Sequence, residues 1–105
     1  MFYQKEFAFS TIFQYHITVN LKQRKVYERI LKNPVQSDIE WRDIEKFLES
    51  LGAEISEGNG SRVRIELNGE RAVFHRPHPE KVTDKGAVKS MRRFLDNAGV
   101  KDDDL

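Results

Sequence analysis

The sequence of 105 residues contains no cysteine, so it can form no disulfide framework and offers no thiolate ligand for a metal. This absence fits a protein of the reducing cytoplasm. The sequence also lacks any apolar run long enough to cross a membrane, and residues 1–10 lack the continuous apolar region of a signal peptide. We therefore expect a cytoplasmic protein with no membrane partner.

A large excess of one charge is missing as well. Lysine and arginine number 18 and aspartate and glutamate 17, which gives a formal net charge of +1. The chain is therefore no bulk polycation, and a surface for nucleic acid would have to arise by segregation of basic residues to one face. The length allows one domain with a modest core.

The clearest pattern that is present is a β-hairpin. Residues 62–67 alternate polar and apolar side chains, and Asn68-Gly69 follows. That dipeptide is the strongest short hairpin signal, because a type I′ turn needs positive φ at both central positions. A two-residue loop pairs Arg62 with His75 and places both on the polar side of the hairpin. The apolar side carries Val63, Ile65, Leu67, Ala72 and Phe74.

Two helices flank the hairpin. The first is predicted over residues 37–51, from a capping box at Ser37-Asp38-Ile39-Glu40, and the second over residues 85–98. Each is followed by a glycine that can end a helix in the left-handed conformation. A short strand over residues 53–57 precedes the hairpin. The order α-β-β-β-α predicts an α+β fold, with a three-stranded antiparallel sheet and both helices on its one apolar face.

Residues 1–36 precede this core as an N-terminal extension, and residues 101–105 follow it as an acidic tail. Within the extension, alternation favours a strand over residues 12–20, and apolar residues at helical spacing favour an extra helix over residues 22–32. We expect residues 1–20 to form an added edge strand, a homodimer contact or a flexible start. Their aromatic side chains would expose an apolar patch if left uncovered, which favours docking.

Residues 37–100 resemble the HicA toxin family of bacterial type II toxin–antitoxin systems. The matching segments are the helix and strand IEKFLESLGAE, the strand GNGSRVRIEL, the hairpin NGERAVFHRPHP and the helix GAVKSMRRFLDNAGV. The resemblance implies a fold like that of a double-stranded RNA-binding domain and messenger RNA as the target. It further implies ribosome-independent RNA cleavage and a HicB-like antitoxin as the protein partner.

The sequence departs from this family at the catalytic position. The family's catalytic histidine follows a Gly-Ser pair, whereas Gly60-Ser61 is followed here by Arg62. An arginine stays protonated and cannot act as a base, although it can stabilise negative charge on a phosphate under attack. Histidine is the natural base because its ordinary pKa lies near neutrality. We hypothesise that His75, beside Arg62, takes the vacant role without a metal or other cofactor; the alternative is a solvated strand residue.

Other residues of the resembling segment are expected to contact RNA. Lys85, Lys89 and Arg92 fall on one helical stripe that could neutralise phosphates, although an ordinary solvated face is the alternative. His78 matches the family's Pro-x-His-Pro-like position, with a structural or substrate-positioning role or only a local backbone contact. It lies three residues from His75 in an extended chain, so the two should leave opposite faces and form no metal site. The full set expected to bind RNA is Ser61, Arg64, Arg76, His78, Lys85, Lys89 and Arg92.

Three functions are compatible with these patterns. The first is a HicA-like toxin that binds and cleaves messenger RNA until an antitoxin covers its basic face. The second is a non-catalytic RNA-binding module that kept the fold and lost the histidine. The third is a protein-interaction domain whose polar sheet face binds a partner protein and never RNA.

Overall fold

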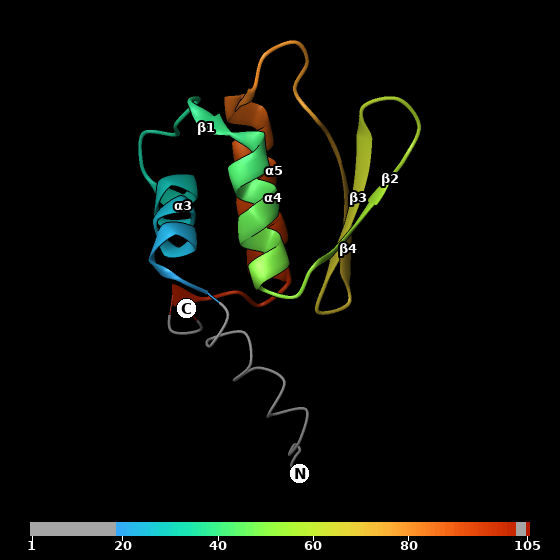
Figure 1. Ribbon diagram of the computed structural model, residues 1–105. Coiled ribbons are helices and arrows are strands. Elements are labelled where there is room, and N and C mark those ends of the chain that lie inside the picture. Colours follow the sequence, from blue (N-terminus) through green and yellow to red (C-terminus); the bar gives the residue numbers. More distant parts are fainter. Residues whose placement is uncertain (1–18, 103–104) are drawn as a thin grey trace.

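The computed structural model describes residues 19–102 and residue 105, and Figure 1 shows their arrangement. The helices are α3 (Leu21–Leu31), α4 (Trp41–Ser50) and α5 (Lys85–Asn97). The strands are β1 (Ile39–Glu40), β2 (Glu54–Glu57), β3 (Arg62–Leu67), β4 (Glu70–His75) and β5 (Val82–Thr83). Most of the strand predicted over residues 12–20 lies outside the described residues, and Asn20 caps the start of α3 by accepting a hydrogen bond from the Gln23 amide.

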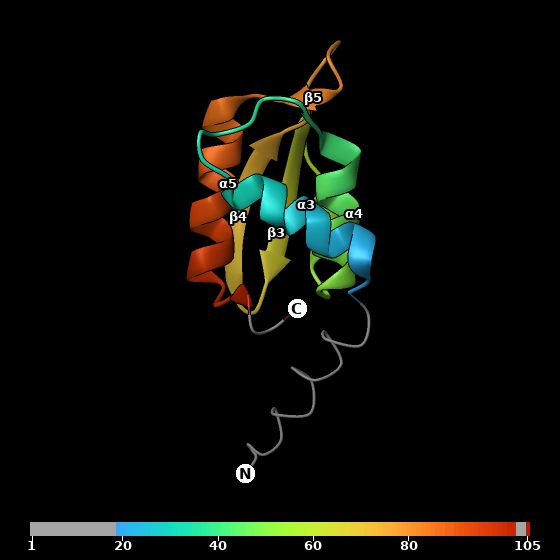
Figure 2. The same cartoon turned by 90° about the vertical axis from the view of Figure 1, so that its left-hand side faces the viewer.

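The elements form three layers, as Figures 1 and 2 show together. Strands β2, β3 and β4 make an antiparallel sheet in that order, and helices α4 and α5 lie side by side against one of its faces. Helix α3 crosses the opposite side of those two helices and contacts both of them. The α+β prediction with an α-β-β-β-α order and an extra N-terminal helix is therefore confirmed.

The hairpin has the register that its turn predicts. Leu67 lies opposite Glu70 and Arg62 lies opposite His75, with every intermediate pair in step. Asn68 and Gly69 adopt φ of 53° and 83°, as a type I′ turn requires. The Asn68 side-chain amide also donates to the Ala98 carbonyl at 2.9 Å, which ties the turn to the end of α5.

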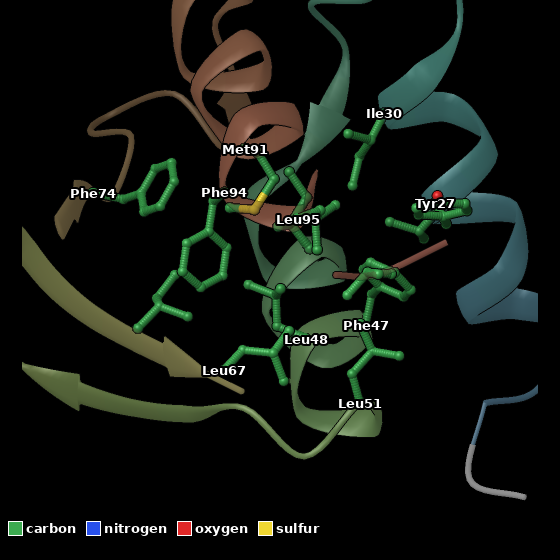
Figure 3. Packing of buried hydrophobic residues seen from close by; sticks show 14 of the residues in the cluster. Tyr27, Ile30, Phe47, Leu48, Leu51, Leu67, Phe74, Met91, Phe94 and Leu95 are labelled. Carbon is green, nitrogen blue, oxygen red and sulfur yellow. The ribbon is translucent and has the colours of Figure 1, made fainter. Parts of the chain in front are cut away.

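One hydrophobic core lies between the sheet and the helices, and α3 extends it on the far side (Figure 3). The Phe74 ring on β4 contacts both Trp41 and Phe94, at centroid distances of 5.8 and 6.2 Å. The Tyr27 ring on α3 lies 5.6 Å from that of Phe47 on α4. Trp41 is therefore a core residue, with 5% of its surface exposed. Helix α3 is part of the same core as the sheet.

The predicted start of the first helix is wrong. Residues 39–40 form strand β1, which pairs with β5 so that the fully buried Ile39 lies opposite Thr83. The helix begins only at Trp41, whose backbone amide donates to the Lys81 carbonyl at 3.0 Å. Within the described part of the chain, Glu40 makes no side-chain cap. A distant backbone carbonyl therefore satisfies one of the amides at the helix start that have no partner within the helix.

Among the described residues, no helix is long and apolar enough to span a lipid bilayer.

Candidate functional site

Arg62 and His75 lie opposite each other at the end of the hairpin, on the face of the sheet that points away from the helices. The Arg76 amide donates to the Ser61 carbonyl at 2.8 Å, so the next pair along the ladder is a hydrogen-bonded one. Pair types alternate along an antiparallel ladder, which makes Arg62 and His75 a non-hydrogen-bonded pair, the type with the closer side chains. Both side chains are exposed. The structure therefore brings together the two residues that the sequence proposes for chemistry.

Ser61 lies next to this pair in the turn between β2 and β3. Its Oγ is 3.4 Å from Nδ1 of His75, which leaves Nε2 as the ring nitrogen that Ser61 does not engage. The turn itself is held by two backbone bonds, from the Gly58 amide to the Arg62 carbonyl and from the Arg62 amide to the Asn59 carbonyl. A partner on Nδ1 favours one orientation of the imidazole.

Arg76, the residue after β4, is enclosed by two carboxylates. Its Nε donates to Oε2 of Glu45 on α4 at 2.7 Å, and its Nη1 donates to Oε1 of Glu57 on β2 at 2.6 Å. Glu45 also accepts a hydrogen bond from the Trp41 indole. The hydrogen bonds to Glu45 and then to Glu57 raise the pKa of the Arg76 guanidinium further above its ordinary value. This guanidinium therefore joins α4, β2 and β4 on the inner side of the sheet.

Arg92 is likewise turned toward the protein. Its guanidinium donates to the Ile30 carbonyl at 2.6 Å, to the Lys32 carbonyl, and to Oδ1 of Asn33 at 3.2 Å. The prediction of an exposed stripe is therefore wrong at Arg92, because its side chain satisfies the carbonyls at the end of α3. Lys85 and Lys89 are exposed, as predicted.

The remaining predicted contacts lie around the same end of the hairpin. His78 is exposed and shares a shallow depression with Gly60, Ser61 and Pro77. Arg64 is on the outer face of β3, where its Nη1 donates to the Glu57 carbonyl at 3.0 Å. The described residues contain no group of three or more His, Asp or Glu side chains that could hold a metal ion.

Glu45 and Glu57 are the residues that sequence reasoning missed. Glu45 occupies a partly exposed helix position, where a charged residue is normally solvated, and Glu57 ends a short strand. The signal that could have found them is the position of Arg76, directly after a strand whose previous residue faces outward, so that its own side chain faces the helices. A guanidinium on that side needs a carboxylate partner.

A sequence model of the HicA toxin of bacterial toxin–antitoxin systems matches residues 41–100. The matched span contains α4, the whole three-stranded sheet, β5 and α5, and therefore also the paired Arg62 and His75. No curated protein and no solved structure matches the chain significantly. Because the match covers more than half of the sequence and the fold has the expected order of elements, the chain belongs to the HicA toxin family of bacterial toxin–antitoxin systems.

Proposed function

We propose that this toxin binds messenger RNA in the cytoplasm and cleaves it without a metal, with His75 as general base and Arg62 as the charge-stabilising group. In this reaction the 2′-oxygen of a ribose attacks the adjacent phosphorus, and its proton passes to Nε2 of His75. The bond from phosphorus to the 5′-oxygen breaks, and the leaving oxygen takes up a proton from water. Negative charge that develops on the phosphorane is stabilised by the guanidinium of Arg62.

The observation that carries this proposal is the position of His75 directly opposite Arg62. The family's catalytic histidine would stand at residue 62. His75 lies opposite that residue on the neighbouring strand, so its imidazole is beside the position of the missing histidine. The Ser61 contact to Nδ1 supports the assignment of Nε2 as the proton acceptor. Because both side chains are exposed, an RNA strand could reach them without a rearrangement of the core.

The proposed RNA contacts divide into two groups on structural grounds. Lys85 and Lys89 are exposed cations suited to phosphate contacts, and Ser61, Arg64 and His78 lie around the paired residues. Arg76 and Arg92 stay predicted RNA contacts, but each now has strong protein partners. Any contact that these two make with RNA would be made by a guanidinium already held in place.

The family implies an antitoxin partner, and we propose that it is a HicB-like protein that covers the outer face of the sheet. That face carries Arg62, Arg64, Arg71 and His75, so a protein bound there would exclude RNA from the paired residues. A homodimer contact through residues 1–20 remains a separate prediction, since residues 1–18 lie outside the described part of the chain.

Cleavage of a fluorescent model RNA by purified variants tests the chemical proposal. We expect His75→Ala to reduce the rate by about 10²- to 10⁴-fold, the usual contribution of a general base. The double swap Arg62→His with His75→Arg retains one imidazole and one guanidinium at the same paired position, so we expect it to recover much of that loss. Arg42→Ala, which removes an exposed arginine from α4, away from the paired residues, is the control and should leave the rate unchanged.

Unchanged cleavage by His75→Ala would remove His75 from the mechanism. If the wild-type protein itself cleaves no RNA, a second candidate function is favoured, because Arg62 stands where the family has its catalytic histidine. The protein would then be an RNA-binding module without nuclease activity. Growth arrest on expression that is abolished by His75→Ala supports the nuclease, whereas salt-sensitive RNA binding without cleavage supports the module.

A further inference from the structure

A shallow hollow of about 520 Å³ lies on the outer face of the sheet. Its lining on β4 includes Val73, two residues before His75. Its lining includes six side chains that the register places on this face, namely Glu54, Ser56, Arg64, Glu66, Arg71 and Val73. The described helices all lie on the other face (Figure 1). No described helix therefore covers the hollow, and Val73 in its lining lies two residues from His75 on the same face of β4.

Val73 on β4 is the one apolar side chain among these six. It has 57% of its surface exposed, the largest exposure of any described apolar side chain on the three-stranded sheet. Its cross-strand partner is Arg64, whose guanidinium is fixed by the Glu57 carbonyl. A flat apolar group could lie on Val73 with the Arg64 plane at its side, as bases do against arginine in RNA complexes.

One wall of the hollow carries an unusual pair of like charges. Glu54 on β2 lies directly opposite Glu66 on β3. Like charges in directly opposed positions destabilise a sheet. Glu66 is partly compensated by Arg71 at 3.3 Å, but Glu54 has no ion-pair partner among the residues that the structure describes. A ligand that donates N–H groups to this wall would relieve the repulsion.

The charges in the hollow balance. This distinguishes the hollow from the end of the hairpin, which carries Arg62 and His75. Two arginines, Arg64 and Arg71, stand against two glutamates, Glu54 and Glu66. A phosphate would be repelled by the two carboxylates and gain more at Arg62 and His75. The hollow instead suits a neutral, flat group with an apolar face and N–H donors on its edge.

We propose that this hollow is a nucleobase subsite, which takes the base next to the cleaved phosphate and prefers adenine or cytosine, whose exocyclic amino group stands where uracil has a carbonyl. The proposal rests on the proposed function. Val73 and His75 are two residues apart on one face of β4, about 7 Å along the strand, which is on the order of one nucleotide step in an extended strand. Adenine and cytosine carry an amino group that can donate a hydrogen bond to the Glu54 carboxylate, whereas uracil has a carbonyl at the corresponding position.

Equilibrium binding of fluorescent eight-nucleotide homopolymers of adenosine, cytidine and uridine tests the subsite. The measurements use the His75→Ala background, so that the strands are not cut during the titration. We expect the adenosine and cytidine strands to bind about tenfold more tightly than the uridine strand. Glu54→Ala should abolish this preference without weakening the binding of the uridine strand. Val73→Thr should weaken all three strands several-fold.

Two matched variants serve as controls, one for the loss of a carboxylate and one for the replacement of valine by threonine. Glu49→Ala removes an exposed carboxylate from α4, and Val82→Thr changes a partly exposed valine on β5; neither should alter affinity or preference. Binding without base preference, or a preference that survives Glu54→Ala, overturns the subsite while leaving the cleavage proposal intact. If no strand binds at low salt, both proposals fail together.

Discussion

Arg76 holds three elements together from a position directly behind the proposed catalytic histidine. Its bonds to Glu45 and Glu57 join β4 to α4 and to β2, and the Trp41 indole completes the network at Glu45. The pKa of this guanidinium is raised, so its contribution to stability is fully present below its unfolded-state pKa and is lost only as the pH rises through the folded-state value. Since both values lie far on the alkaline side, we expect no loss of this contribution near neutral pH.

Glu45→Ala should therefore lower the free energy of unfolding by about 1–3 kcal/mol, because it leaves the Arg76 guanidinium and the Trp41 indole without their shared acceptor. Urea denaturation followed by tryptophan fluorescence measures the change. Glu49→Ala on the same helix is the control, with an expected effect within about 0.5 kcal/mol. Equal effects of the two substitutions would show that the network adds nothing to stability.

Residue contacts of this kind differ in how far the sequence predicts them. The pairing of Arg62 with His75 is predicted because the two-residue turn at Asn68 and Gly69 fixes which residues of the two strands lie opposite each other. The partners of Arg92 are not, because they belong to a helix whose placement depends on tertiary packing. Side-chain contacts set by local turn chemistry are therefore accessible from sequence, whereas those set by the docking of distant elements are not.

At the scale of elements, α3 is joined to the family-matched part of the chain by both apolar and polar contacts. Ile30 is fully buried in the common core, and Arg92 on α5 bonds to the carbonyls that end α3. The end of this helix therefore depends on a side chain from another element. Unsatisfied carbonyls at a helix end are costly where they are shielded from water.

We expect Arg92→Ala to lower the free energy of unfolding by about 1–3 kcal/mol, since the carbonyls of Ile30 and Lys32 lose their charged donor. Arg93→Ala is the matched control, because Arg93 is exposed and bonds to Ser90 on its own helix at 3.3 Å. Thermal unfolding by circular dichroism compares the two. A loss no larger for Arg92→Ala than for Arg93→Ala would contradict the assigned role.

The elements themselves were largely predictable, with one instructive exception. Helix α3 lies within one residue of the predicted 22–32, and α5 and the three sheet strands agree similarly. The predicted helix start at Ser37 failed because β1 pairs with β5, a strand far along the chain. A local capping motif was thus overridden by a tertiary pairing that buries Ile39.

At the scale of the whole molecule, the near-zero net charge makes the placement of cations decisive. On single-stranded RNA, each phosphate contact contributes roughly 0.7 to the magnitude of the slope of log affinity against log salt concentration. If Lys85 and Lys89 each contact a phosphate, replacing both by alanine should therefore reduce the magnitude of this slope by about 1.4. Lys22→Ala with Lys25→Ala removes the same charge from exposed positions on α3 and is the control. Equal slope changes in the two double variants would indicate a diffuse field instead of a defined RNA face.

The layer order has a consequence for how such a toxin would be switched on. With α3 laid across the two helices, the broad side left open by the described elements is the outer sheet surface (Figure 1). An inhibitor and a substrate that both need this surface are mutually exclusive occupants. Cellular activity would then follow a titration threshold, rising sharply once the inhibitor falls below one copy per toxin.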